Sequence, residues 1–500
     1  MPDHQSLRGH LRHIQQHPNL YPQLLPERYV QRQPERHPYA MSTVTSFRPR
    51  NRRNVELVLL LLAVAIVLVA YLNVGLAMDG AFPPDLVKYG SGLLFLTLGF
   101  HLVLRWRASY ADPLMLPIAT LLNGLGLVMI HRLDLAYSRT GSHLLAPKQL
   151  MWSTLGVVIA VGVIIVLRDH RQLRRFTFTA MAAGLGMLLL PLVPGIGRNI
   201  NGSRIWIGLG PLSFQPGEVA KILLVIFFAG YLVQTRDVLS LVGRRFLGIG
   251  LPRAQDLGPI LIAWLASVGV LVFEKDLGSS LLFFGLFVAM LYVATERRSW
   301  IAIGMVLFCA GAYVAYLLFG HVQTRVLLWL DPFSAKAIAA SDQLVKGLMG
   351  MASGGLFGTG LGRGHPELTY FPESDFIVPS FGEEIGLLGL FALLLLYLLL
   401  VERGLRTALG VRDGFGKLLA VGLSFSVALQ CFVVVGGVTR VIPLTGLTMP
   451  FLSYGGSSLL ANWSLVALLL RISDQARRPL PDPEELASAS MAHTQVVTKR

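Results

Sequence analysis

The stretch LVLLLLAVAIVLVAYLNVGLAM, residues 57–78, is uncharged and almost entirely apolar. It is long enough to cross a bilayer as one α-helix, because the ~30 Å hydrocarbon core requires ~20 helical residues. The whole chain has 500 residues, of which 53% are hydrophobic and only 14% are charged. This composition excludes a set of soluble domains and indicates an all-α, polytopic membrane protein.

Similar runs recur along the chain and predict about twelve transmembrane helices. They cover residues 55–78, 86–105, 112–131, 149–167, 176–195, 216–234, 256–273, 278–295, 300–319, 381–401, 416–439 and 447–470. The polar stretch 320–380 separates the ninth and tenth spans and is far longer than a usual connection. Because long loops on a rigid scaffold often carry function, we expect binding or catalysis there.

The distribution of Lys and Arg predicts the orientation. The loops on one side of the predicted membrane hold sixteen of these cations, and the short loops on the other side hold eight. The positive-inside rule therefore places both termini in the cytoplasm and the 320–380 loop outside the cell membrane. The same rule explains the net charge of +15, so no nucleic-acid partner is expected.

The two ends of the chain differ from the apolar middle. Residues 1–53 are rich in Gln, Pro, His and Arg and predict a disordered, basic cytoplasmic tail, with Met41 as an alternative start. Residues 473–500 predict a short polar cytoplasmic tail. The two cysteines, Cys309 and Cys431, lie inside apolar spans and predict no disulfide.

The first of four polar segments, residues 201–221, leads into the sixth span. Glu218 falls in the first helical turn, where it either meets the helix dipole or pairs with Lys221. Lys221 lies about one turn deeper and needs an anionic partner, because a charge within a membrane is costly. Arg204 beside Trp206 either holds a phosphate or anchors the loop at the interface.

The second segment is Glu274-Lys275-Asp276, in a turn between the seventh and eighth spans. Three adjacent charges in a turn are usually solvated. Asp276 precedes Leu-Gly-Ser-Ser, however, and we favour it as the N-cap of the eighth span.

The third segment is the long loop itself. Arg325, Lys346 and Arg363 provide cations, and the glycine-rich run 354–364, which begins with Gly354 and Gly355, can turn tightly. Such a run either brings backbone N–H groups close to a ligand or is only flexible. Asp375 either caps the next helix or acts chemically, since carboxylates crowded beside cations have tunable pKa values.

The fourth segment, residues 436–458, breaks the helical pattern at the edge of the last two spans. Broken helices at membrane depth are tolerated where they line a cavity or are buried in protein. Small residues also allow close helix packing. Its candidate loop and structural positions are Pro443, Thr445, Gly446, Ser453, Gly455 and Gly456.

In this order, the four segments resemble the SEDS family of shape, elongation, division and sporulation proteins, which includes RodA and FtsW. The resemblance covers residues 112–472 as a ten-helix core, and the two spans within 54–111 are an N-terminal addition. Residues 443–446 and 469–478 lean toward the RodA of actinobacteria. The motifs that carry the resemblance are residues 201–207, 214–221, 276–279, 371–377, 382–386, 443–446 and 450–458.

The resemblance implies a peptidoglycan glycosyltransferase that polymerises lipid II at the outer membrane face. The family's essential aspartate maps onto Asp375, which would act as the general base. Its other polar elements map onto Arg325, Asp331, Pro332, Gln215, Pro216, Glu218 and Lys221. The chain departs from the family pattern at Lys346, Gly217 and residues 274–276, so their roles stay open.

The leaving pyrophosphate would then be stabilised by cations, for which Arg325, Lys346, Arg363 and Lys221 are candidates. A divalent cation, Mg²⁺ or Mn²⁺, is a further candidate cofactor. The expected partners are a class B penicillin-binding protein and other elongation or division proteins. Two alternatives remain: a lipid II flippase, which predicts charges at mid-membrane, and a non-catalytic scaffold of the wall-synthesis complex.

Overall fold

The computed structural model describes most of the membrane region and excludes nearly all of both predicted tails. Its described residues belong to one compact unit, Pro49–Arg500. They are 52–138, 145–200, 203–209, 212–240, 244–246, 249–251, 262, 264–265, 269 and 276–479.

Eleven helices in the described part are long and apolar enough to cross a membrane. The predicted span 256–273 lies outside the described residues except for four isolated positions. Ten of the eleven are α2 (Arg53–Met78), α3 (Leu86–Arg107), α4 (Met115–Ser138), α5 (Ala146–Val166), α7 (Pro216–Ser240), α9 (Leu277–Thr295), α10 (Ser299–Leu318), α14 (Ile377–Gly410), α15 (Gly414–Val438) and α16 (Gly456–Arg477). The eleventh combines α6 (Thr177–Leu189) with the flanking 3₁₀ turns η1 (His170–Phe176) and η2 (Leu190–Leu192).

Four predicted boundaries differ from the structure. The last span was expected from residue 447, but α16 begins at Gly456, because Gly446 and Phe451 have left-handed φ values of 75° and 65°. The helix also continues to Arg477, into the predicted C-terminal tail. The third span begins at Met115 rather than at 112. The tenth begins earlier than expected, at Ile377, and is interrupted at Gly386.

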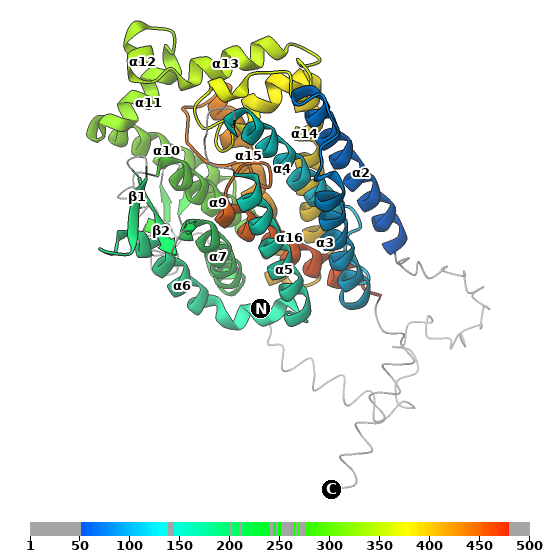
Figure 1. Ribbon diagram of the computed structural model, residues 1–500. Helices are drawn as coiled ribbons and strands as arrows, with labels where there is room; N and C mark the ends of the chain where they lie inside the picture. The colour runs from blue at the N-terminus through cyan, green and yellow to red at the C-terminus, as the bar shows by residue number, and fades with distance from the viewer. Residues whose placement is uncertain are drawn as a thin grey trace, which may run out of the picture. The chain divides into compact units, whose positions relative to one another are not determined.

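The long loop is largely helical. It contains α11 (Gly320–Leu330), α12 (Ala335–Ala340), α13 (Gln343–Gly354) and the short turn η3 (Pro366–Leu368). These helices lie together at one end of the bundle (Figure 1), which we call the loop end. Phe319 has extended backbone angles and separates α11 from α10, so the loop does not simply prolong the ninth span.

Two small sheets were not predicted. β1 (Gly197–Ile200), β2 (Ser203–Leu209) and β3 (Leu212–Phe214) form an antiparallel sheet in the order β1-β2-β3, between α6 and α7. β4 (Arg244–Phe246) pairs with β5 (Ile249–Leu251) in a hairpin. Helix still dominates, so the predicted fold class stands with these additions.

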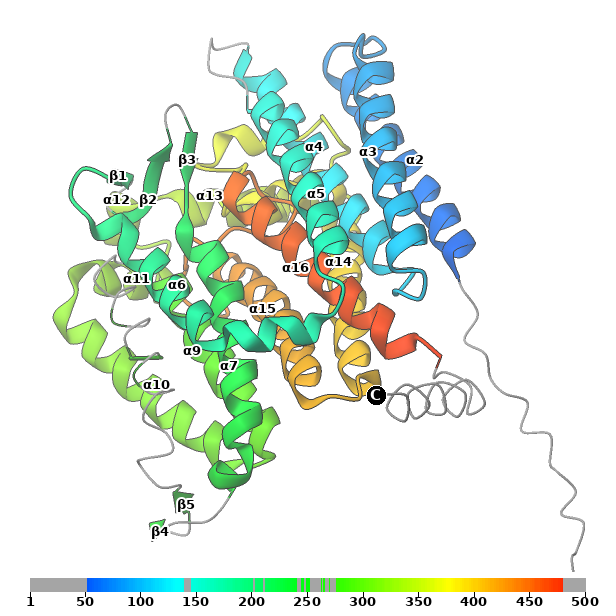
Figure 2. The same ribbon diagram turned by 90° about the horizontal axis from the view of Figure 1, so that it is seen from below.

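The interior of the bundle is formed mainly by α4, α7, α15 and α16, whose side chains are mostly buried. Trp463 of α16 and Phe227 of α7 are among its largest fully buried side chains. By contrast, α2, α3 and α10 are mostly exposed on their outward faces, as expected for helices that contact lipid. α2 packs against α4, and α3 packs against α2 and α5, at one edge of the bundle (Figures 1 and 2).

The interruption of α14 is closed by the glycine run of the loop. Gly386 has φ 67° and ψ −172°, so the carbonyls of Glu383 and Glu384 lose their partners four residues ahead. They accept hydrogen bonds from the N–H groups of Thr359, at 3.0 Å, and Gly360, at 2.9 Å, instead.

The backbone N–H groups of α14 that the interruption leaves without partners also bond to the glycine run. The N–H of Leu387 donates to the carbonyl of Gly355 at 3.0 Å, and that of Leu388 to Leu356 at 3.1 Å. Residues 355–360 therefore complete the backbone hydrogen bonding of α14. The run was expected to be flexible or to offer its N–H groups to a ligand. The structure shows it instead as a part of the helix packing.

This exchange needs glycine at several positions. A Cβ atom at Gly386 would lie 2.2 Å from the nitrogen of Gly358, and one at Gly354 would lie 2.2 Å from the carbonyl oxygen of Gly382. We therefore expect Gly386→Ala to lower the free energy of unfolding by about 1–3 kcal/mol for the backbone strain alone, with the clash adding to it. Thermal unfolding of the purified protein in detergent measures this.

Gly99→Ala is the matched control, because a Cβ atom at Gly99 of α3 meets nothing within 4 Å. Since alanine favours helix over glycine by about 1 kcal/mol, this variant should be as stable as the parent or slightly more so. Equal unfolding temperatures for Gly386→Ala and the parent would contradict the assigned role of the exchange.

Candidate functional site

Asp375 lies immediately before α14, at the loop end. The N-cap residue of this helix is Phe376, and no side chain makes a capping hydrogen bond there. The carboxylate of Asp375 accepts instead from the hydroxyl of Ser374 at 3.1 Å. The capping interpretation of Asp375 is therefore wrong, and its half-buried carboxylate is free for another role.

The backbone around Asp375 is held by the segment that precedes α16. The N–H of Tyr454 donates to the carbonyl of Glu373 at 2.7 Å. The hydroxyl of Ser453 donates to the carbonyl of Ser374 at 2.5 Å. Two hydrogen bonds to consecutive carbonyls fix the position of Asp375 relative to α16.

The surroundings of Asp375 favour its neutral form. Burial raises the pKa of its carboxyl group to about 6, and the charge of nearby Glu373 acts in the same direction. The Ser374 hydroxyl and the Arg325 guanidinium oppose this shift. A carboxylate with a pKa near the working pH is ionised at neutrality and still holds a proton strongly, as a general base must.

Arg325 of α11 lies between two carboxylates. Its Nη1 donates to the carbonyls of Leu444 and Thr445, both at 2.9 Å. Burial lowers the pKa of the guanidinium, whereas the charges of Asp276 and Asp375 act to raise it. The two backbone hydrogen bonds use one nitrogen of the guanidinium and fix the group where its charge acts on both carboxylates.

Residues 439–455, between α15 and α16, connect these parts. The Gln149 side chain of α5 donates to the carbonyl of Ser453 at 3.1 Å and accepts from the N–H of Gly455 at 3.2 Å. A Cβ atom at Gly456 would lie 2.3 Å from the ring of Trp152. Pro443, Thr445 and Gly446 lie in the same segment, beside Arg325 and the start of α9.

Glu218 and Lys221 form a buried ion pair near the start of α7. The Lys221 ammonium is 3.0 Å from a Glu218 carboxylate oxygen and 2.8 Å from the side-chain oxygen of Gln430 of α15. Gln430 in turn donates to the carbonyl of Thr448 at 2.9 Å. The predicted pairing of Lys221 with Glu218 is confirmed.

Asp276 caps α9, as the sequence predicted, by accepting from the N–H of Ser279 at 2.9 Å. Its carboxyl group is also buried, which raises its pKa, and it faces Arg325 and Glu218. It thus belongs to the polar cluster while it caps the helix. Glu274 and Lys275 lie outside the described residues.

The other predicted phosphate-binding cations lie in partly or fully exposed positions. Lys346 pairs with Asp342 at 3.0 Å and lies 4.5 Å from the centre of the Tyr370 ring; the Asp342 hydrogen bond raises its pKa. Arg363 is exposed beside η3, and Arg204 is exposed on β2. Asp331 is an exposed residue at the end of α11. Among the described residues, none of these four side chains forms a hydrogen bond or ion pair with Asp375.

The family model for the cell cycle proteins FtsW, RodA and SpoVE, described as "Cell cycle protein", matches residues 113–478. The chain belongs to this family. It is 51% identical over 453 residues to the peptidoglycan glycosyltransferase RodA of Mycobacterium tuberculosis, which covers 90% of this chain and 96% of the relative. RodA of Mycobacterium leprae is 48% identical, with 91% and 98% covered. The predicted lean toward actinobacterial RodA is confirmed.

More distant members of the family match a shorter part of this chain. Stage V sporulation protein E of Bacillus subtilis is 32% identical and covers 74% of this chain and 99% of its own length. The crystal structure of the rod shape-determining protein RodA of Thermus thermophilus superposes with a TM-score of 0.52 at 27% identity, with 74% and 98% covered. A peptidoglycan synthase complex gives a TM-score of 0.50 at 26% identity, with 77% and 98% covered.

Sequence reasoning missed a second polar cluster in this SEDS protein, beneath the glycine run. Arg132 of α4 donates to Glu384 at 2.5 Å, to Glu367 at 2.6 Å and to the carbonyl of Gly364. Glu383 accepts from the N–H of His365 at 2.6 Å. Glu383 and Glu384, which follow Asp375 closely in sequence, therefore hold the loop. A buried arginine in an apolar span was the available signal.

The divalent cation expected from the family resemblance was tested against the donor groups. In the described ranges, no group of three or more His, Cys, Asp or Glu side chains is arranged to hold a metal ion. The carboxylate whose charge acts on Asp375 is that of Glu373, and burial raises the pKa of Glu373 as well. We derive no step through a metal ion.

The buried ion pair between Lys221 and Glu218 should stabilise the fold. Lys221→Met removes one partner and leaves Glu218 as a buried charge, so it should lower the free energy of unfolding by about 3–5 kcal/mol. Adding Glu218→Gln to the same chain should recover a large part of that loss. Thermal unfolding of the two single variants and the double variant measures the coupling, and strictly additive losses would contradict a direct pair.

Proposed function

We propose that this chain is a peptidoglycan glycosyltransferase that polymerises lipid II at the outer face of the cytoplasmic membrane. The observation that carries the proposal is Asp375, whose pKa is raised to about 6 and whose carboxylate is within the electrostatic influence of Arg325. The 51% identity to a named peptidoglycan glycosyltransferase over nearly the whole chain supports it. Both termini would then be cytoplasmic, as the distribution of cations predicts.

The reaction joins a sugar hydroxyl of one lipid II molecule to the anomeric carbon of another. Asp375 takes the hydroxyl proton as the oxygen attacks, which contributes ~10²–10⁴-fold. The bond from the anomeric carbon to the pyrophosphate breaks, and its electron pair leaves with the undecaprenyl pyrophosphate. Asp375 then returns the proton to water.

The charge that develops on the leaving pyrophosphate falls near Arg325, whose guanidinium has hydrogen-bond donors besides the Nη1 fixed by Leu444 and Thr445. α14 begins two residues after Asp375, so its N-terminus directs partial positive charge toward an anion bound there. Lys221 contributes to the stabilisation of this charge indirectly, through the ion pair that it forms with Glu218. Arg363 and Arg204 are exposed, and Lys346 is partly exposed and paired with Asp342, so these cations are better placed to meet substrate or partner outside the site.

A class B penicillin-binding protein is the proposed partner, because a glycan polymerase needs a transpeptidase to cross-link its product. The structural similarity to a peptidoglycan synthase complex supports this assignment. The relative is named RodA, which favours elongation over division as the process served.

Asp375→Asn should reduce lipid II polymerisation by ~10²–10⁴-fold while the protein still folds and inserts, because the amide cannot accept the proton. The measurement is gel separation of labelled glycan strands made by the purified protein with its transpeptidase, in the presence of moenomycin. Asp85→Asn, at an exposed carboxylate before α3, is the matched control and should leave the rate unchanged.

A normal rate in Asp375→Asn would contradict the base assignment. Absence of product from the parent protein, even with its partner present, would instead favour the flippase or the scaffold. Movement of labelled lipid II across a vesicle membrane then separates those two alternatives.

The pH dependence follows from the pKa of Asp375. Below pH about 6 the carboxyl group is protonated and cannot act as a base, so the rate should rise as the pH increases through that value. Glu373→Gln removes a charge that raises the pKa of Asp375, and it should therefore move this limb to lower pH. Glu402→Gln, at the opposite end of α14, should not move it.

A further inference from the structure

Gln149 is a buried polar residue in an apolar helix. It lies in the first turn of α5 and is only 1% exposed. Its amide nitrogen donates to the carbonyl of Ser453 at 3.1 Å, and its amide oxygen accepts from the N–H of Gly455 at 3.2 Å. Because a backbone carbonyl only accepts and a backbone N–H only donates, these two partners fix the orientation of the amide.

One peptide group joins Gln149 to the backbone beside Asp375. The carbonyl of Ser453 accepts from Gln149. The N–H of the same peptide group, which belongs to Tyr454, donates to the carbonyl of Glu373 at 2.7 Å. A peptide group is planar and resists rotation. A displacement of its carbonyl end therefore also moves its N–H end, and with it the backbone two residues before Asp375.

The Ser453 hydroxyl makes a second connection to the same backbone. It accepts from the N–H of Met449 at 2.8 Å and donates to the carbonyl of Ser374 at 2.5 Å. The two residues that precede Asp375 are thus both held from the segment that Gln149 clamps.

The other end of the clamped segment is fixed independently. Gln430 of α15, which is fully buried, donates to the carbonyl of Thr448 at 2.9 Å. Residues 448–455 are therefore anchored to α15 at one end and to α5 at the other. Removal of the Gln149 amide should loosen only the end nearest Asp375.

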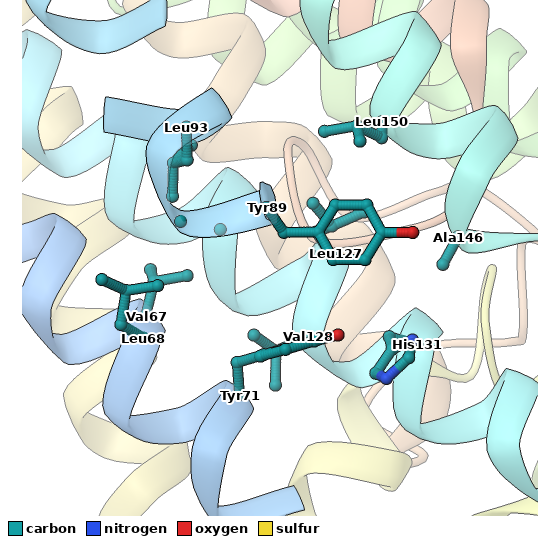
Figure 3. Close-up of a pocket in the computed structure, with 12 residues that line it drawn as sticks. Val67, Leu68, Tyr71, Tyr89, Leu93, Leu127, Val128, His131, Ala146 and Leu150 are labelled. Carbon is teal, nitrogen blue, oxygen red and sulfur yellow. The ribbon is translucent and has the colours of Figure 1, made fainter. Parts of the chain in front are cut away.

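The helix that carries Gln149 is itself closely packed on two faces. Toward α16, a Cβ atom at Gly156 would lie 2.7 Å from the ring of Trp463. On another face, Ala146 and Leu150 line a cavity of about 40 Å³ with residues of α2, α3 and α4 (Figure 3). This volume is close to that of one water molecule, so that face serves packing rather than ligand binding.

We propose that Gln149 is a positioning residue for the proton transfer by Asp375. Its amide fixes the peptide group between Ser453 and Tyr454, which holds the backbone before Asp375 so that the carboxylate makes no capping hydrogen bond to α14. The kinetic consequence of this role rests on the proposed function, whereas the orientation of the carboxylate does not.

The expected effect follows from the groups that surround Asp375. The charges that act on it are those of Glu373 and Arg325, and a substitution at Gln149 changes neither. Burial raises the pKa of Asp375 to about 6. A carboxylate released toward the start of α14 would gain backbone N–H donors and lose burial, and both changes lower its pKa. The acidic limb of kcat/KM should therefore move to lower pH.

The test substitutes Gln149→Met, which keeps the length of the side chain and removes both hydrogen bonds. In the full-length protein with its transpeptidase, kcat should fall ~10–10²-fold because the base is misplaced, with KM little changed. The acidic limb should move down by about half a pH unit or more. Ser153→Ala is the matched control, because it removes a buried hydrogen bond to Asn123 from the same helix and should leave the limb in place.

A second readout needs no turnover. Infrared titration of the Asp375 carboxyl group, taken as the difference between each protein and its Asp375→Asn counterpart, should give a midpoint near pH 6 in the parent and a lower one in Gln149→Met. If the parent makes no product, the proposed function fails, but this titration still decides the role of Gln149. An unchanged midpoint in a folded Gln149→Met would overturn the proposal. So would a higher midpoint, because it would report loss of the Arg325 charge instead.

Ser453→Ala guards against misfolding of Gln149→Met. It removes the hydroxyl that holds the Ser374 carbonyl and leaves the Gln149 side chain in place, and it should lower the midpoint in the same direction. Because the two groups act in series, the double variant should shift the midpoint no further than the larger single change. Additive shifts would show that Gln149 acts by another route and would overturn the assigned connection.

Discussion

The exchange of backbone hydrogen bonds at Gly386 is the constraint on which the loop end depends. An interrupted helix in a membrane leaves N–H and C=O groups that water does not reach, and each costs several kcal/mol if unpaired. Here four such groups of α14 are paired with residues 355–360. Disrupting either α14 or residues 355–360 leaves backbone N–H and C=O groups of both segments unpaired. The loop and the helix are therefore stable only together.

The interruption also decides where the chemistry lies. The short helical piece from Ile377 to Ile385 is separated from the rest of α14, and Asp375 precedes it. Arg132, Glu383 and Glu384 fix the other end of that piece against the loop. The side chains nearest to Asp375 in sequence thus serve its position, while its electrostatic partner, Arg325, comes from α11.

The sequence predicted what depends on local chemistry. Continuous apolar runs predicted the eleven helices that the described part of the chain contains. The spacing of Glu218 and Lys221 predicted their ion pair, and the Asp-Leu-Gly-Ser pattern predicted the N-cap at Asp276. The sequence did not predict the exchange at Gly386, because a glycine with φ above 0° is indistinguishable in sequence from one that only allows close packing. The roles of Gln149 and Gln430 were also missed, because each depends on a segment hundreds of residues away in sequence.

The raised pKa of Asp375 depends on both local sequence and long-range packing. A carboxylate next to a helix start would ordinarily be stabilised by the dipole and by capping, both of which lower the pKa. Ser453 and Tyr454 prevent this by holding the carbonyls of Ser374 and Glu373, so the carboxylate turns away from the backbone donors of α14 and lies among buried groups. The Ser374 hydroxyl, the backbone N–H of Asp375 itself and the Arg325 guanidinium favour the charged form, but burial outweighs them. The segment before α16 therefore sets the basicity of a residue on another helix, and the bundle must be complete before Asp375 can act as a base.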